Sequence, residues 1–368
     1  MRAETPHSNA DNPPIRVHNN GGTGALQRAA SSNQRPFSEP DPAKPSPRPD
    51  PSGSLKRKAQ TDARGSQKRP RHASWPASLA PEPLSINGLL RQHSRHRLFV
   101  TPLQWKPLQL ELLGCRFTIG KAGKAGRTRN KDSSFDPDLL ADSAICAALS
   151  RIRCLATPSF KRYAMQTMLQ GCGMRLDAYS SLDFYFNQLA VATLQTDGVF
   201  VCNSCPFGGW LAFLDLPLVS ERRDNSIKST HFKRVNNPGY AIRQRRLRNI
   251  QPTNKAEDPY IAAVLIALAQ EQRRQRADAA AKNQGPSIES PKHFKVHVLA
   301  LSELKVASLY FYTARIPSTF LDRLDSPSLH IPSKPFRVSY HRIFLSSTAT
   351  MKLGMNIAMS AIYHGHEH

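Results

Sequence analysis

The sequence predicts a single α+β domain, with a small, partly antiparallel sheet and two long helices, behind a disordered basic tail. The first observation is a change of composition along the 368-residue chain. The aromatic residues of the first 84 positions are Phe37 and Trp75, and twelve of the 29 prolines lie in the first 80. Such a segment buries too little apolar surface to offset the entropy lost on ordering it.

The second observation is the order of the apolar stretches that follow Leu98. They read as strand, helix, strand, strand, helix, strand, strand and helix, so only one pair of neighbouring strands is joined by a long helix. That order favours a partly antiparallel sheet over a doubly wound one. We therefore expect a tail over 1–84, a globular domain over 85–330, and a C-terminal segment over 331–368 without a recognisable pattern.

Two basic clusters in the tail have the spacing of a bipartite nuclear localisation signal. Nine residues separate them, and the clusters consist of Lys56, Arg57 and Lys58, and of Lys68, Arg69 and Arg71. An extended chain can place each cluster in a separate acidic groove of an import receptor. The sequence thus predicts a nuclear protein whose partner is a nuclear import receptor. The alternative is a basic linker without that role.

Residues 113–119 have the composition of a strand, and a basic glycine loop follows them. Lys121, Lys124 and Arg127 alternate in this loop with glycines. Glycine amides and cations together suit a phosphate. A P-loop requires G-x-x-x-x-G-K-[ST], and this loop has one intervening residue too many and Arg in place of Lys. The three cations are therefore candidate phosphate contacts, and a solvated basic turn is the alternative.

Residues 180–197 show an apolar spacing that predicts a helix, capped by Ser180 and followed by a strand over 199–202. Cys202 and Cys205 lie at the end of that strand. A structural zinc site needs four ligands, usually as two pairs, and the sequence has no second pair. The six cysteines are irregularly spaced, as expected of reduced thiols. We expect no metal and no other cofactor.

The basic segment 222–248 is the main candidate for contact with nucleic acid. It holds nine Lys and Arg against one acid, Asp224, and includes Tyr240. Cations suit phosphates, and an interleaved aromatic side chain can stack on a base. The expected phosphate contacts are Arg243, Arg245, Arg246 and Arg248. In the alternative, the segment is a solvated loop whose arginines pair with acids such as Glu257 or Asp258.

Residues 259–284 are the clearest helix in the sequence. Asp258 can cap it, Pro259 fits its first turn, and Gly285 can end it. Its first half is apolar on all sides, which predicts burial. The remaining elements are expected as strands over 210–219, 294–301 and 308–314 and a short helix over 317–325.

The net charge of the chain, and the absence of a leader and of a membrane span from its sequence, narrow the classes of function that we expect. The net charge of +24 indicates an acidic partner such as a phosphate backbone. The N-terminus lacks an apolar leader, and the longest apolar run, 260–269, is too short to span a bilayer. We therefore expect no membrane association. The leading hypothesis is a nuclear, non-enzymatic binding or scaffold protein, with a protein partner not yet identified and weak, sequence-independent contact to DNA or RNA.

The alternative is a Mg²⁺-dependent nuclease of the restriction-endonuclease type, active or degenerate. Its chemistry needs an Asp and then a Glu-x-Lys on the next strand, to hold Mg²⁺ and activate water. Asp215 lies near a strand end, but Glu303 and Lys305 lie much further along the chain, in a predicted turn. The sequence shows no nucleophile elbow, kinase signature or H-E-x-x-H motif. We assign no catalytic residue.

Four blocks of the chain resemble a group of uncharacterised proteins of filamentous fungi. The blocks are "CRFTIGKAGKAGR", "DGVFVCNSCPFGGWLAFLDLPLV", "DPYIAAVLIALAQ" and "LYFYTARIPSTFLDRL". The resemblance spans roughly residues 110–325, and the chain departs from it after about residue 331. It implies a fungal protein with one shared domain and implies no activity.

Overall fold

A seven-stranded mixed sheet is the centre of the fold. The computed structural model describes residues 80–120, 136–153, 157–177, 181–203, 209–228, 237–283, 291–302 and 308–363. The strands of the sheet are β1 (Cys115–Ile119), β2 (Met174–Leu176), β5 (Gly198–Cys202), β6 (Trp210–Asp215), β7 (His293–Leu301), β8 (Ser308–Pro317) and β9 (Phe336–Phe344).

The strand order in the sheet is β1-β9-β8-β7-β6-β5-β2. The pairs β1–β9 and β6–β7 are parallel, and the other neighbouring pairs are antiparallel. A separate two-stranded hairpin consists of β3 (Ser181–Phe186) and β4 (Leu189–Gln195). The predicted α+β class with a partly antiparallel sheet is confirmed.

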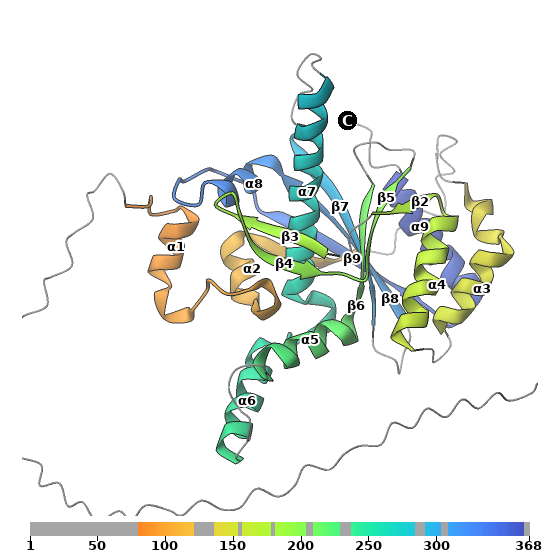
Figure 1. Cartoon of the computed structure of the whole chain (residues 1–368), viewed down its shortest axis with the longest axis horizontal. Helices are drawn as coiled ribbons and strands as arrows, with labels where there is room; N and C mark the ends of the chain where they lie inside the picture. Colours follow the sequence, from red (N-terminus) through yellow and green to blue (C-terminus); the bar gives the residue numbers. More distant parts are fainter. Residues whose placement is uncertain are drawn as a thin grey trace, which may run out of the picture. The chain divides into compact units, whose positions relative to one another are not determined.

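Helices cover both faces of the sheet (Figure 1). The α-helices are α1 (Ile86–Gln92), α2 (Pro107–Leu113), α3 (Ser143–Arg153), α4 (Pro158–Gly171), α5 (Leu216–Lys228), α6 (Asn237–Ile250), α7 (Pro259–Asn283), α8 (Ser318–Asp325) and α9 (Thr348–Tyr363). Short 3₁₀ turns are η2 (Ser94–His96), η3 (Pro102–Gln104), η5 (Pro137–Ala141) and η6 (Lys255–Glu257). None of the helices within the described ranges is long and apolar enough to cross a membrane.

Alternating side chains of the sheet contribute to two separate cores. On β6, Trp210 and Leu214 pack into the core shared with α7, whereas Leu211 and Phe213 pack into the core shared with α3, α4 and α9. This alternation follows from the two-residue period of a strand. Because both faces are covered, β6 is buried along its whole length. A buried strand of this kind reads in the sequence as one continuous apolar run.

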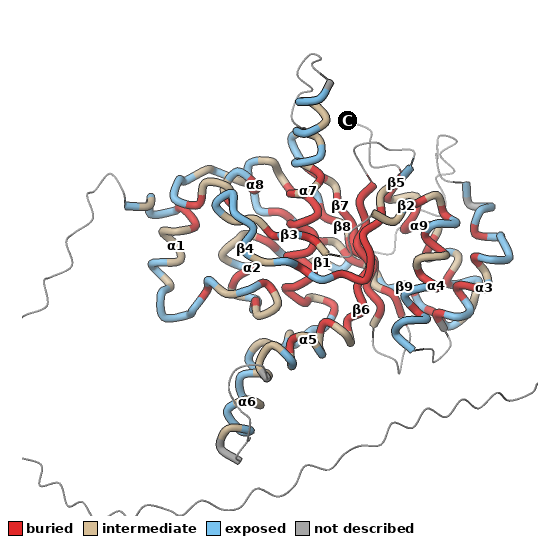
Figure 2. The backbone as a smooth tube through the Cα atoms, viewed as in Figure 1, coloured by how far each residue is buried: buried red, intermediate tan, exposed pale blue. Residues whose placement is uncertain are grey.

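Helix α7 confirms the sequence prediction, including its cap. The backbone amide of Tyr260 donates a hydrogen bond to Asp258 Oδ1 at 2.9 Å, and Pro259 occupies the first turn, where its missing amide is not needed. Residues 259–270 are buried, and the end of the helix is more exposed (Figure 2). The first half is buried because it is apolar on every side.

The helix predicted over 180–197 is wrong, because this segment forms the β3–β4 hairpin. Leu182 and Phe184 are buried and alternate with more exposed residues, which is the period of a strand. Asn187 and Gln188 have φ values of 53° and 61°, the left-handed pair that a two-residue hairpin turn requires. The apolar residues also fit a helical spacing, so the pattern alone does not decide between the two structures.

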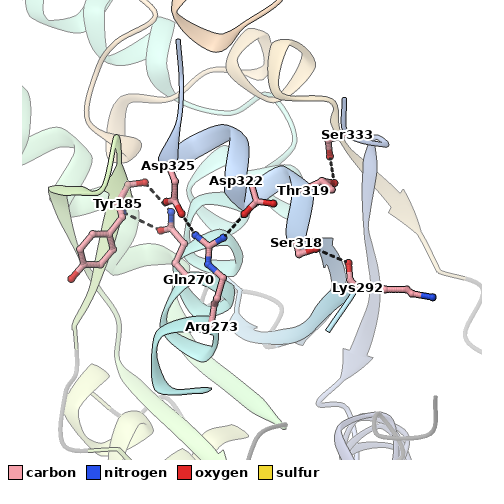
Figure 3. A network of polar contacts seen from close by, with 9 residues as sticks. All are labelled: Tyr185, Gln270, Arg273, Lys292, Ser318, Thr319, Asp322, Asp325 and Ser333. Atoms are coloured by element: carbon pink, nitrogen blue, oxygen red, sulfur yellow. Dashed lines mark hydrogen bonds and ion pairs between the residues drawn. The ribbon is translucent and has the colours of Figure 1, made fainter. Parts of the chain in front are cut away.

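One amide side chain of α7 holds the backbone of the hairpin (Figure 3). Gln270 accepts a hydrogen bond from the Tyr185 backbone amide at 3.0 Å and donates one to the Tyr185 carbonyl at 2.8 Å. These bonds lie at the irregularity of register between Phe184 and Tyr185. Arg273, one turn further along α7, pairs with Asp322 and Asp325 of α8. The polar side chains of α7 therefore fasten the elements around it.

Residues 331–363 of the C-terminal segment, for which the sequence analysis assigned no pattern, belong to the domain. Strand β9 lies between β1 and β8 in the sheet, and α9 contributes Met351, Met355 and Met359 to the core shared with α3 and α4. The domain boundary placed at residue 330 is therefore a wrong prediction. In β9, buried and more exposed positions alternate, but two polar residues, Ser339 and His341, and two arginines obscure this alternation in the sequence.

Two further predictions need correction after residue 209. The strand predicted over 210–219 ends at Asp215, and α5 begins immediately, with Pro217 in its first turn. The basic segment 222–248, considered above as a loop, contains the end of α5 and most of α6. Pro217 was interpreted as the end of a strand, although proline is equally suited to the first turn of a helix.

Candidate nucleic-acid interface and an adjoining polar pocket

Helix α6 is a basic helix that packs against α5 at one end (Figure 1). Residues 237–250 contain four arginines and no acid. Arg243 Nη2 lies 2.8 Å from Asp224 Oδ1 of α5, and both side chains are partly buried. Asp224 is the one acid of segment 222–248, so this ion pair uses its charge and leaves the rest of α6 strongly positive.

The other three arginines, Arg245, Arg246 and Arg248, are exposed. Successive residues are about 100° apart around a helix, so their side chains spread over about 160° of its surface. The described residues provide none of them with an ion pair; Arg248 Nε donates to the Gln244 carbonyl at 3.4 Å. Tyr240 is 54% exposed on the same helix. The exposed surface of α6 can therefore meet several phosphates and offer one aromatic ring.

The acids proposed as alternative partners of these arginines have other contacts. Asp258 is buried and pairs with Arg223 of α5 at 2.7 Å. Glu257 Oε1 accepts a hydrogen bond from the Tyr340 hydroxyl at 2.9 Å. The alternative of pairing with these acids is therefore confirmed for Arg223 of segment 222–248, but among the described residues it is wrong for the arginines of α6.

A polar pocket of about 310 Å³ lies at the foot of α6. It is bounded by the first turns of α5, by the segment that links α6 to α7, and by the sheet where β7 ends and where β8 begins. The lining residues are Leu216, Pro217, Ser220, Arg223, Gln251, Pro252, Lys255, Asp258, Ser302, Tyr310 and Arg342. Its position is at the carboxyl ends of β6 and β7, the edge of a parallel pair where α/β proteins commonly bind ligands.

The floor of this pocket is a buried ion pair. Arg223 is 1% exposed, and its Nη2 lies 2.7 Å and 2.9 Å from the two oxygens of Asp258. Arg223 Nε donates to the Leu103 carbonyl at 3.0 Å. Because two charges out of water are costly unless they are well paired, this geometry fixes α5 against the start of α7.

Asp215, the acid considered for nuclease chemistry, has a different local role. Its side chain accepts from the Leu218 amide, and its own amide donates to Asp197 Oδ2 at 2.7 Å. Burial, followed by the charge of Asp197, raises the pKa of Asp215. Arg162 lies 2.8 Å from Asp197 Oδ1. Asp215 therefore caps α5, and Asp197 belongs to an ion-pair network.

The other two residues of the nuclease motif, Glu303 and Lys305, have no described position. Asp215 is the ladder neighbour of Leu301, but Glu303 and Lys305 lie outside the described residues. Among residues that the structure does describe, no group of three or more His, Cys, Asp and Glu side chains could hold a metal ion.

Several other predicted sites also fall outside the described ranges. Both basic clusters of the tail, the cations Lys121, Lys124 and Arg127, and Cys205 lie there. Cys202 is described: it is 3% exposed and packs in the core shared with α3, α4 and α9. Burial raises the pKa of Cys115 and of Cys172 to about 12.

Comparison with family models, with curated proteins and with solved structures gives no match. The support for the candidate site therefore comes from the residues and contacts of this chain alone. Sequence reasoning found the α6 arginines but missed the pocket beside them, since Arg342 belongs to the strand that was not predicted. The sequence carries one signal for the role of Arg223. Its charge lies four residues after Val219, the end of an apolar stretch, and four residues is a helical spacing.

Proposed function

We propose that this protein is a nuclear, non-enzymatic nucleic-acid-binding protein that contacts the phosphate backbone through α6. The observation that carries the proposal is the set of three exposed arginines on α6, Arg245, Arg246 and Arg248, without an ion pair among the described residues. The net charge of the chain, +24, supports an acidic partner of this kind.

The arginines spread around the helix, so they form a charged surface and do not read base edges. Contacts to phosphates position a protein on nucleic acid but carry no sequence information. We therefore expect affinity in the micromolar range or weaker near physiological salt, with little preference among sequences. Tyr240, which is half-exposed on α6, gives single strands an additional stacking surface.

The test is a salt titration of the full chain against a fluorescent duplex and a fluorescent single strand. Each phosphate contact adds about 0.9 to the log–log salt slope for duplex DNA, so replacing Arg245, Arg246 and Arg248 with Gln should lower the slope by about 2 to 3. The control replaces three exposed arginines elsewhere, Arg91, Arg95 and Arg151, with Gln.

The two triple variants separate local contact from overall charge, because both lose three positive charges. A slope reduced only by the α6 substitutions supports the proposal. An equal reduction in both variants would mean that general charge attracts the nucleic acid. Binding that is unaffected by salt, or absent at low salt, would contradict the proposal directly.

The nuclear part of the proposal depends on the tail. The full chain fused to a fluorescent reporter should accumulate in the nucleus. Replacement of Lys68, Arg69 and Arg71 with Ala should abolish this, since the import receptor reads clustered cations in an extended chain. The same reporter carrying Ala at Arg91, Arg95 and Arg151 is the matched control, and cytoplasmic signal from the unaltered chain would refute the localisation.

A further inference from the structure

A row of basic side chains crosses four neighbouring strands of the sheet. Lys295 of β7 is the register partner of Arg315 of β8, and Arg337 of β9 is the register partner of Arg116 of β1. Arg315 and Arg337 lie one residue beyond the last pair of the β8–β9 register, so these two adjoin as well. The four side chains, here named the basic row, therefore lie side by side across β7, β8, β9 and β1.

The basic row lies on the sheet face that carries the core shared with α3, α4 and α9, beyond the edge of that core. Side chains two or four positions apart in a strand share a face, and Leu299, four positions from Lys295, belongs to that core. Arg116, Arg315 and Arg337 are exposed, whereas Lys295 is partly buried. Three guanidinium groups on adjacent strands are therefore open to solvent on this face.

The described residues supply the basic row with no carboxylate. The arginines of the row take part in none of the ion pairs in the described part of the chain. Lys295 Nζ donates to the Ala361 carbonyl of α9 at 2.5 Å. Burial, followed by the charge of Arg315, lowers the pKa of Lys295 to about 8. The positive charge of Arg315 therefore acts on its neighbour without compensation from a described acid.

Neither sheet stability nor protection of a sheet edge accounts for these like-charge pairs. Like charges directly opposite each other destabilise a sheet. A basic side chain on an edge strand can prevent pairing with another chain, and this suits Arg116, since β1 is an edge of the sheet. The other three members of the row belong to β7, β8 and β9, which are interior strands. An anion that lies over the row would compensate its charges.

We propose that the basic row is a second surface for the phosphate backbone of a nucleic-acid strand, separate from α6. Neighbouring strands are about 4.8 Å apart, so the row spans roughly 14 Å. That length matches about four phosphates of one strand at about 3.4 Å per phosphate. Thr118, two positions from Arg116 on β1, shares the same face and adds a hydroxyl group. Arginine, lysine and threonine side chains are common donors to phosphate oxygens.

The basic row lies at the end of the sheet opposite to the start of α5, the helix on which α6 packs. Asp215, where β6 ends and α5 begins, is the register partner of Leu301. Lys295 lies six residues before Leu301 on β7, which is about 20 Å along the strand. The two surfaces therefore use different residues at different ends of the sheet, and binding at the row does not depend on the proposed function of α6.

The test is protection of individual arginines of the full chain from hydroxyphenylglyoxal, read by peptide mass spectrometry, with a mixed-sequence single-stranded oligonucleotide as the probe. Labelling of Arg116, Arg315 and Arg337 should fall several-fold when the strand is added at low salt and should recover at high salt, since phosphate contacts weaken steeply with salt. The exposed side chains of Arg91 and Arg151 are controls within the same chain. Protection confined to α6, or equal protection of the two controls, would overturn the proposal.

Two variants make the results for the basic row and for α6 distinguishable. With Gln at the three arginines of the row, the strand should still protect α6, and the free energy of unfolding should not fall, because the substitutions remove like-charge pairs. With Gln at the three exposed arginines of α6, the strand should still protect the row. Protection of the row without protection of α6 would support this surface and contradict the proposed function alone.

An acidic polymer tests whether the basic row selects phosphates. Polyglutamate at the same concentration of charge should protect the three arginines of the row less than the oligonucleotide does, since a guanidinium fork and a threonine hydroxyl together suit phosphate oxygens. Equal or stronger protection by polyglutamate would identify an acidic protein as the partner and overturn the assignment to nucleic acid.

Discussion

Replacing Arg223 with Met tests whether the buried ion pair holds α5 against α7. The substitution removes three hydrogen bonds, two to Asp258 and one to the Leu103 carbonyl. Asp258, which is 4% exposed, would then keep the Tyr260 amide as the one donor to its side chain that the described residues provide. Removing one partner of a buried pair leaves an uncompensated charge and typically costs about 3 to 5 kcal/mol. That is a large share of the about 5 to 15 kcal/mol that stabilises a typical domain.

The assay is urea unfolding, followed by tryptophan fluorescence, of Arg223→Met, of Asp258→Asn and of the double variant. Because the double variant removes both charges, its loss should be smaller than the sum of the single losses by about 2 kcal/mol. Arg274→Met is the control, since half-exposed Arg274 pairs with Glu271 and lies over the Tyr185 ring, and the loss of these exposed contacts should cost about 1 kcal/mol. Single losses as small as that control, or strict additivity in the double variant, would refute the reasoning.

Three further outcomes follow from particular residues. Cys115 and Cys172 should resist iodoacetamide at about pH 8 until the chain is unfolded, as peptide mass spectrometry can measure, because burial raises the pKa of each thiol to about 12. Gln188→Gly should raise the free energy of unfolding by about 0.5 to 1 kcal/mol in urea titrations, since Gln188 has a φ of 61° that glycine adopts without strain. Burial lowers the pKa of His341 below 6.5, so as pH falls the unfolded chain is protonated at this residue before the folded chain is. The free energy of unfolding should therefore fall as pH decreases below about 6.5, and it should fall less in His341→Leu. Urea titrations at two pH values measure both changes.

The sequence predicted correctly those elements in which the local signals agree. Helix α7 was found because proline, a capping acid and an all-round apolar stretch agree. The hairpin was missed because Leu182, Tyr185, Phe186 and Leu189 fit a helical face as well as a strand. The deciding contacts, from Gln270 to Tyr185, join residues that are 85 positions apart. Such contacts are invisible to a local pattern.

Strand β9 and helix α9 were missed for a related reason. In β9 the exposed and half-buried positions include Arg337, Ser339 and Arg342, and the strand is recognisable only once β1 and β8 lie on either side of it. Its parallel pairing with β1 joins Cys115 to Phe336. Sheet formation between such distant segments depends on tertiary packing more than on intrinsic preference.

The candidate site was predictable in its charge and not in its geometry. A run of arginines with one acid is visible in the sequence, but the sequence did not indicate that Asp224 would pair with Arg243 and not with its neighbours. Nor did it indicate that Arg342 would reach the pocket, which requires the placement of β9. Charge is a property of composition, whereas a pocket is a property of the folded chain.

The proposed nucleic-acid surface of α6 depends on buried residues that hold this helix in place. Helix α6 packs on α5 through Arg243 and Asp224, and α5 is fixed by the Arg223–Asp258 pair and by its cap at Asp215. The pair is also the floor of the pocket. A substitution at Arg223 would therefore disturb the pocket and the support of α6 together. Loss of nucleic-acid binding in such a variant would therefore not identify the binding surface. The identification must come from the exposed arginines of α6, whose replacement leaves this buried support intact.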